Sequence, residues 1–267
     1  MIDVFSGGMV MLIDQHLHTN FSWDCYEPLE NYLKLTKNPI MTTEHLDYYD
    51  FEIDGDCEPD YEAYVAEIDY LSKKYNRKIY KGLEVGYTSK DRERINQYLE
   101  GKEYDLIMLA IHQDGEVNFM SRAARNLSQE VLLDRYLDLV ITALKEVDYA
   151  QVLAHLDFGM RLTNIPYSLV VTREAKIKEI MELLVEKKMA LEVNTRSLYQ
   201  YGNEDMYEFF LKVYQSVGGT MVSLGSDTHS TGWYMYEFDR AIKFLKRLGI
   251  HQVTQADKGV LHLVDLV

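Results

Sequence analysis

The chain has 267 residues and a net charge of −15, from 28 basic and 43 acidic side chains. So acidic a surface repels phosphate backbones, and we expect no nucleic-acid partner. Two cysteines cannot form a disulfide framework, and no apolar stretch approaches the roughly 20 residues of a membrane span. The start of the chain lacks the basic region of a signal peptide, so we expect a cytoplasmic protein that binds no membrane.

Short apolar runs alternate along the chain with longer amphipathic stretches. The predicted strands are, in chain order, 9–18, 39–45, 78–87, 104–112, 150–157, 189–195 and 220–229, and 260–267 is a candidate terminal strand. No proline-, glycine- or serine-rich linker interrupts this alternation, which predicts a single domain over residues 1–267.

Stretches with helical period lie between the apolar runs. The predicted helices are 59–75, 128–147, 171–188 and 236–249. Ser128 is a typical N-cap for the second of these, and Gly249 is a usual helix-ending residue after the fourth.

Strands that alternate with helices are typical of a parallel sheet, because parallel neighbours need connections of about a dozen residues or more. Seven such units predict an α/β fold, a seven-stranded (β/α) barrel of the TIM-barrel kind. A doubly wound open sheet is the alternative. It normally has a glycine-rich phosphate loop after its first strand, and residues 14–22 (DQHLHTNFS) contain no glycine.

Nearly every predicted strand ends in a residue that can bind a metal ion. His16 and His18 are two positions apart at the end of the first run, so they point to the same face of an extended chain. The other strand-end candidates are His45, Glu84, His112, His155, Asp227 and His229. Because the carboxyl ends of the strands form one rim of an α/β barrel, we expect all these side chains to converge there.

Taken singly, each candidate has an ordinary structural explanation. A lone histidine is more often a hydrogen-bonded structural residue, Glu84 could be salt-bridged, and Asp227 could cap a helix. Taken together, six imidazoles and two carboxylates on one rim would be costly without a cation. The set exceeds the ligands of one zinc site and favours two or three divalent ions, zinc, iron or manganese, with Glu84 bridging. We assign His251 and His262, outside the pattern, to structure.

The ordered motifs DQHLHT, TTEH, GLEVG, AIH, AHLD and GSDTH resemble the motif set of the PHP (polymerase and histidinol phosphatase) superfamily. The resemblance implies a distorted seven-stranded barrel with a trinuclear metal centre that hydrolyses phosphate esters. The ligand sets it implies are His16, His18, Glu84 and Asp227 for one ion, Glu84, His112 and His155 for a second, and His45 and His229 for a third. Many relatives have a further histidine ligand where this chain has Asp24, and aspartate also binds metals.

Residues 155–161 (HLDFGMR) and 191–198 (LEVNTRSL) further resemble the small stand-alone L-histidinol phosphate phosphatases of that superfamily. They contribute Arg161 and Arg196, just past two predicted strand ends. Without the resemblance, salt bridges on an acidic surface would explain both arginines better. With it, we expect both to bind phosphate, because a guanidinium matches two phosphate oxygens.

The resemblance implies a phosphomonoesterase of histidine biosynthesis that acts on L-histidinol phosphate with a metal-activated hydroxide. Glu84, Asp227, Arg161 and Arg196 are the implied catalytic residues, and Asp114 and Asp157 are candidates for protonating the leaving group. Three alternatives stay open: a nucleotide or another small phosphate ester as substrate, repair of DNA ends, and a non-catalytic metal-binding module. The negative charge disfavours DNA, and the complete motif set disfavours a decayed site. We expect no obligatory protein partner.

Overall fold

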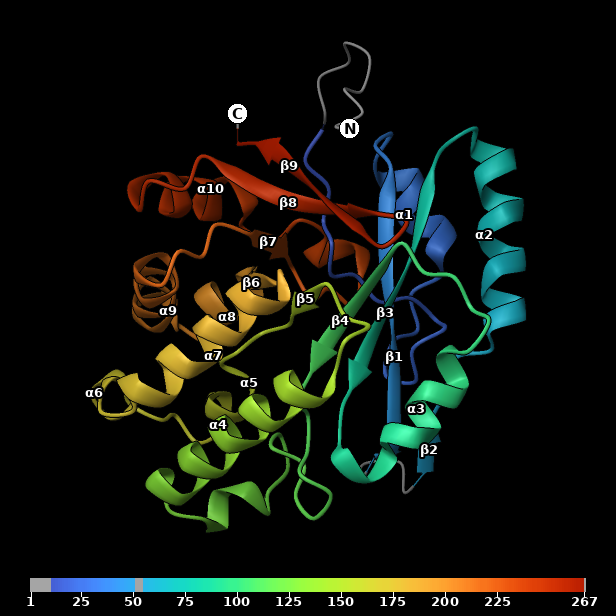
Figure 1. Ribbon diagram of the computed structural model, residues 1–267. Coiled ribbons are helices and arrows are strands. Elements are labelled where there is room, and N and C mark those ends of the chain that lie inside the picture. The colour runs from blue at the N-terminus through green and yellow to red at the C-terminus, as the bar shows by residue number, and fades with distance from the viewer. Residues whose placement is uncertain (1–10, 51–54, 267) are drawn as a thin grey trace.

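The computed structural model describes residues 11–50 and 55–266, so residues 9 and 10 of the first predicted strand lie outside it. A seven-stranded sheet has the order β2-β1-β3-β4-β5-β6-β7, in which β2 is antiparallel to β1 and all other neighbours are parallel (Figure 1). Its strands are β1 Ile40–Asp50, β2 Gly55–Cys57, β3 Ile79–Gly86, β4 Leu106–Ala110, β5 Val152–Leu153, β6 Ala190–Asn194 and β7 Val222–Gly225. The prediction of a distorted (β/α) barrel is confirmed.

The barrel closes through the segment predicted as the first strand, but the prediction of a regular strand is wrong there. Its described part forms only an isolated parallel bridge, between Leu17 and Thr228. The Leu17 carbonyl accepts a hydrogen bond from the Thr43 amide of β1 at 2.7 Å, and the His18 amide donates to the Thr228 carbonyl at 2.9 Å. The segment therefore joins the two edges of the sheet. Its ladder is interrupted because the Leu17 amide donates to the Thr43 hydroxyl instead of to backbone.

The fifth strand is also shorter than predicted, for the same kind of reason. The prediction covers 150–157, whereas β5 is only Val152–Leu153. The His155 amide donates to the carboxylate of Glu192 at 2.7 Å, so a side chain takes the place of the next ladder partner.

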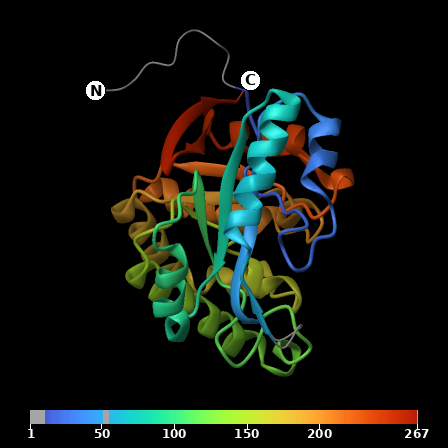
Figure 2. The same cartoon turned by 90° about the vertical axis from the view of Figure 1, so that its right-hand side faces the viewer.

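Helices cover the outside of the sheet (Figures 1 and 2). The four predicted ones are α2 Tyr61–Tyr75, α4 Gln129–Glu146, α7 Glu174–Lys187 and α10 Phe238–Arg247. Ser128 caps α4 by accepting from the Val131 amide, and Gly249 follows α10 with a φ of +77°. Sequence periodicity did not single out α1 Leu29–Leu35, α3 Arg92–Leu99, α5 Phe158–Arg161, α6 Tyr167–Val171, α8 Thr195–Tyr199 and α9 Glu204–Ser216. Within the described ranges, no helix has both the length and the hydropathy needed to cross a bilayer.

The inward face of the sheet changes from apolar to ionisable along the strands. Alternate residues share a face, so on β1 this face runs from Met41 to His45 and Asp47. Met41 belongs to a small buried apolar cluster with Leu106 and Ala190, residues near the starts of their strands. The ionisable groups are therefore confined to the end of the barrel where the strands finish.

A C-terminal hairpin covers the opposite end of the barrel, where the strands begin (Figure 1). It consists of β8 Gln252–Asp257, which was not predicted, and β9 Val260–Asp265, which corresponds to the predicted terminal strand. The buried Gln15 side chain ties the hairpin to the barrel. Its amide nitrogen donates to the Thr254 carbonyl and the Ser223 hydroxyl, and its oxygen accepts from the Ala256 amide at 2.8 Å.

We expect Gln15→Ala to lower the free energy of unfolding of the metal-free protein by about 3 kcal/mol, because it leaves several buried polar groups without partners. Urea denaturation followed by circular dichroism measures this change. Lys78→Ala is the control. It removes an ammonium 2.7 Å from Asp257 on the same hairpin, but that lysine is 45% exposed, so the loss should stay below about 1 kcal/mol. Equal losses in the two variants would contradict the assigned role of Gln15.

Candidate active site

The predicted metal-binding residues converge where the strands of the barrel finish. Glu84, near the end of β3, is fully buried at the centre of the group. The imidazole nitrogens 2.6–3.5 Å from its two oxygens belong to His16, His18, His45, His112 and His155. One carboxylate thus contacts five rings, from β1, the barrel-closing segment and the ends of β4 and β5.

Asp227 approaches the same group from the end of β7. Its Oδ1 lies 3.7 Å from His18 Nε2 and 3.9 Å from His16 Nε2. The residue has a φ of 54°, in the left-handed region that aspartate tolerates better than most residues. This backbone conformation aims its carboxylate at the histidine pair.

Asp24 lies at the more exposed side of the group. Its Oδ2 is 2.9 Å from His229 Nε2 and 3.6 Å from His45 Nε2. The rings of His45 and His229 both stack on His18, with centroids 4.2 and 4.3 Å away. The structure therefore brings all nine predicted ligands into one cluster.

Four groups of three residues within this cluster have donor atoms within 4.8 Å of one another, a spacing that one cation could span. The groups are His16–His18–Glu84, His16–His155–Asp227, His45–Glu84–His112 and His18–His45–His229. The groups overlap and share residues, so the geometry gathers the ligands without dividing them into the three predicted sets.

The donor atoms of the cluster fit divalent cations. Among the described residues, four buried nitrogen or oxygen atoms of this cluster have no hydrogen-bond partner: Glu84 Oε2, His45 Nδ1, Asp24 Oδ1 and His155 Nδ1. Buried polar atoms are normally paired, and coordinated cations would provide partners for such atoms. Mixed imidazole and carboxylate ligation suits zinc, iron or manganese.

The electrostatics of the cluster point the same way. Burial alone would lower the pKa of His16, but the carboxylates of Glu192 and Glu84 outweigh it and raise that pKa well above its ordinary value. Burial likewise opposes protonation of His112, yet Asp47 and Glu84 raise its pKa to about 10. Burial would raise the pKa of Glu84, but the surrounding imidazoles, His16 first, hold it well below the usual range. The cluster thus requires positive charge.

A cavity of about 650 Å³ opens over the ligands, and both predicted arginines line it. Arg161, which is buried, has Nη1 3.5 Å from Asp227 Oδ2, and Arg196, about one third exposed, has Nη1 3.7 Å from Asp227 Oδ1. The remaining walls are formed by Trp23, Tyr26, Asn118, Met120, Phe158 and Tyr201, together with Asp47. None of these was predicted from the sequence, and the aromatic and amide side chains among them carry no local signal of a site.

Asp157 holds Arg161 in place and does not line the cavity. Its carboxylate accepts hydrogen bonds from Ser197, Asn203 and Tyr207 at 2.7–2.9 Å, and Arg161 Nε lies 3.4 Å away. Burial would raise the pKa of Asp157, but the guanidinium and these donors outweigh it and lower the pKa. An ionised carboxylate with every oxygen engaged is a poor proton donor to a leaving group.

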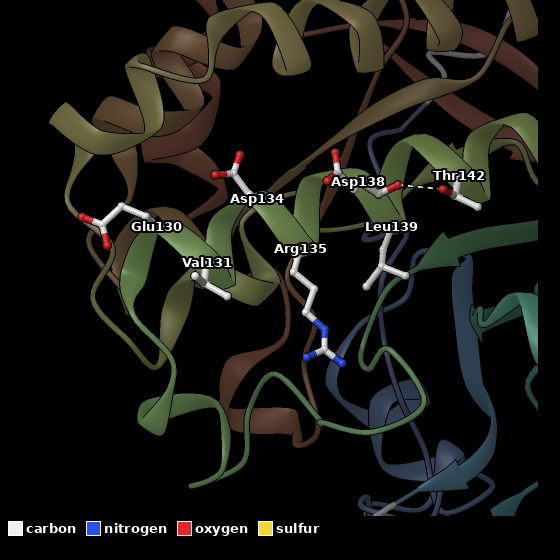
Figure 3. Close-up of a pocket in the computed structure, with 7 residues that line it drawn as sticks. All are labelled: Glu130, Val131, Asp134, Arg135, Asp138, Leu139 and Thr142. Atoms are coloured by element: carbon white, nitrogen blue, oxygen red, sulfur yellow. Dashed lines mark hydrogen bonds between the residues drawn. The ribbon is translucent and has the colours of Figure 1, made fainter.

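A second hollow lies along the outer face of α4 (Figure 3). Its lining residues all belong to that helix, and none is a predicted ligand.

Arg135, one of them, reaches from the helix to pair with Asp114. Asp114 does not line the cavity over the metal ligands. Neither carboxylate considered for protonating the leaving group is therefore placed to do so.

Two carboxylates that the sequence analysis missed lie behind the imidazoles. Glu192 Oε1 is 2.7 Å from His16 Nδ1, and Asp47 Oδ1 is 2.8 Å from His112 Nδ1. Asp47 follows His45 by two positions, the same spacing that indicated the first histidine pair, so this pattern could have identified it. Glu192 lies in the tripeptide LEV of β6, as Glu84 does in the same tripeptide of β3.

A barrel with imidazoles and carboxylates gathered at the carboxyl ends of its strands, under a cavity lined by arginine, defines a metal-dependent enzyme. Residues 14–196 match the PHP domain family, and the chain belongs to this family. The family predicted from the motifs is thus confirmed.

The relatives are similar over most of their length. Histidinol-phosphatase of Lactococcus lactis is 26% identical over 256 residues, which cover 90% of this chain and 93% of that protein. Probable histidinol-phosphatase of Thermotoga maritima is 25% identical over 253 residues, which cover 94% and 98%. The crystal structure of Lactococcus lactis histidinol phosphate phosphatase, complexed with zinc, L-histidinol and phosphate, has a TM-score of 0.84 and 24% identity over 93% of this chain and 98% of that chain. This likeness supports the barrel fold.

We expect zinc binding to the metal-free protein to release protons. Imidazoles with a raised pKa, such as those of His16 and His112, hold protons near neutral pH and must lose one to ligate a metal. Zinc affinity should therefore fall as the pH is lowered. Calorimetric titration in two buffers with different ionisation enthalpies measures the number of protons released. Identical heats in both buffers, with an affinity independent of pH, would contradict this expectation.

Proposed function

We propose that the protein is a phosphoric monoester hydrolase whose substrate is L-histidinol phosphate, and that the described domain carries the whole reaction. One observation supports this most directly. Two arginines lie on the same cavity as the metal-ligand cluster, each within 3.7 Å of the Asp227 carboxylate. Metal cations and the two-pronged guanidinium groups of arginine, when they face the same cavity, suit the binding of a phosphate group. The substrate is inferred from the names of the relatives.

We assign two or three divalent ions to the cluster, zinc, iron or manganese. The assigned sets are His16, His18, Glu84 and Asp227, then Glu84, His112 and His155, and finally Asp24, His45 and His229. When bound, such ions supply positive charge to the phosphate oxygens and lower the pKa of an attacking water.

The arginines bind and orient the phosphate group. Arg161 is held by Asp157 and Ser197, so its guanidinium is fixed before the substrate arrives. Positions fixed in advance stabilise the charge that develops on the non-bridging oxygens in the transition state. Arg196 is more exposed. Among the described residues its Nε donates to Gln200 and its Nη1 to the Asp227 carbonyl, which leaves Nη2 available to a phosphate oxygen.

The size and charge of the cavity suit a small cationic leaving group. A volume of about 650 Å³ lies within the usual range for small-molecule sites. Histidinol carries an ammonium group, and Asp24 and Asp47 line the cavity beside aromatic side chains. Carboxylates and aromatic faces both attract such a cation.

We expect the metal-loaded protein to cleave L-histidinol phosphate with a kcat/KM roughly 100-fold above that for an aryl phosphate or a 5′-nucleotide, because polar groups that recognise the leaving group are unpaired with other substrates. Phosphate release with each compound measures this ratio. Equal kcat/KM values for these compounds would contradict L-histidinol phosphate as the specific substrate, but not the assignment as a phosphatase. No hydrolysis with zinc, manganese or iron would overturn both.

We expect Arg161→Lys to lower kcat/KM about 100-fold with the metal content unchanged, because lysine keeps the charge beside Asp157 but loses the two-pronged contact. Steady-state kinetics and metal analysis of the same preparation measure the two quantities. Arg135→Lys, on the outer face of α4, is the control and should behave as wild type. Loss of metal in Arg161→Lys would instead make the role of this arginine structural.

A further inference from the structure

The buried carboxylate of Glu192 is surrounded by groups that can donate hydrogen bonds to it. This carboxylate on β6 is fully buried, and its Oε1 lies 2.7 Å from His16 Nδ1. Its Oε2 accepts from the His155 amide at 2.7 Å and from the Asn194 side-chain amide at 3.2 Å. An ionised carboxylate only accepts hydrogen bonds, so each of its neighbours must donate.

A glycine leaves room for this arrangement. Gly225 on β7 pairs with Asn194 on β6. A Cβ atom at Gly225 would lie 2.5 Å from Glu192 Oε1 and 2.4 Å from His16 Cβ, closer than side chains tolerate. The glycine of the GSDTH motif therefore allows the histidine and the carboxylate to meet.

We propose that Glu192 is a positioning residue that fixes the tautomer of His16. An acceptor at Nδ1 requires the proton of the neutral ring to be at Nδ1, which leaves the Nε2 lone pair free for a metal ion. His16 Nε2 faces Glu84 Oε2 at 3.3 Å, so the free lone pair points into the metal-ligand cluster. The proposal rests on the metal-binding part of the proposed function and does not depend on the substrate.

The substitution Glu192→Gln tests this directly, because the surrounding donors dictate the orientation of the new side-chain amide. The His155 amide and the Asn194 side chain both donate to the Oε2 position, so the amide oxygen of glutamine must occupy it. The amide nitrogen then faces His16 Nδ1 and donates to it. The proton of His16 is thereby moved to Nε2, where it blocks the metal. Glu192→Gln thus keeps the shape of the side chain and inverts the tautomer.

Asp47 offers a matched control with the opposite expectation. Its Oδ1 lies 2.8 Å from His112 Nδ1, and it too abuts a glycine, Gly86. Among the described residues, no backbone or side-chain amide donates to this carboxylate. His45 Nδ1, 3.4 Å from Oδ2, has no hydrogen-bond geometry there. In Asp47→Asn, the side-chain amide is therefore free to turn its oxygen toward His112 and preserve that tautomer.

The experiment compares zinc-loaded wild type, Glu192→Gln and Asp47→Asn, labelled with ¹⁵N-histidine. Chelator competition measures zinc affinity. Long-range ¹H–¹⁵N spectra report which nitrogen of each imidazole ring carries a proton. The His16 signals are assigned as those that disappear in the spectrum of His16→Gln. We expect the affinity of one site to fall about 100-fold in Glu192→Gln and about 10-fold in Asp47→Asn. The proton on His16 Nδ1 should be present in wild type and Asp47→Asn and absent in Glu192→Gln.

A Glu192→Gln protein that keeps the His16 Nδ1 proton, or binds zinc as well as Asp47→Asn does, overturns the proposal. If circular dichroism shows that this variant does not fold, the ¹H–¹⁵N spectrum of the wild type tests the proposal. A His16 ring that is bound through Nδ1, or protonated at Nε2, overturns the proposal. A His16 ring that is protonated at Nδ1 and bound through Nε2 supports it. A wild type with the expected tautomer that hydrolyses no phosphate ester supports the role of Glu192 and overturns only the proposed function.

Discussion

The negative charge of Glu84 lies inside the barrel, out of reach of solvent, and must be balanced there. Five imidazoles close around its two oxygens, and Asp227 adds further negative charge from the end of β7. Apolar packing cannot compensate such a group. Protons on the rings or metal cations between them can, which is why the rim of the barrel consists of ligating side chains.

A second layer of buried groups holds the first in position. Glu192 and Asp47 engage the far nitrogens of two rings, and Asp157 engages Arg161. The space for the two imidazole–carboxylate pairs comes from Gly225 and Gly86, at which any Cβ atom would overlap the pair. The glycines of the motifs thus serve the site through the volume they leave free, and the orientation of His16 and His112 depends on the carboxylates of Glu192 and Asp47 behind them.

Stability and chemistry are separated along the barrel axis. The closed end is apolar and is covered by the β8–β9 hairpin, to which Gln15 makes two hydrogen bonds, while a third joins Gln15 to Ser223 on β7. At the open end the ladder is interrupted where the Leu17 and His155 amides bond to side chains. At this end, side chains replace backbone carbonyls as hydrogen-bond acceptors and thereby shape the site. At the opposite end, apolar packing and the hairpin hold the same strands in place.

The sequence by itself determined the order of the parallel strands of the sheet, four of the helices, the barrel and the ligand candidates, because apolar periodicity and a histidine at a strand end are local patterns. It also indicated Arg161 and Arg196 through short motifs. Only the tertiary structure decided that Asp114 turns away to Arg135 and that Glu192 stands behind His16. That pair is 176 positions apart, and its hydrogen bond depends on neighbouring strands and on a glycine between them. Local pattern carries no information about such a contact, since it arises from the packing of distant segments.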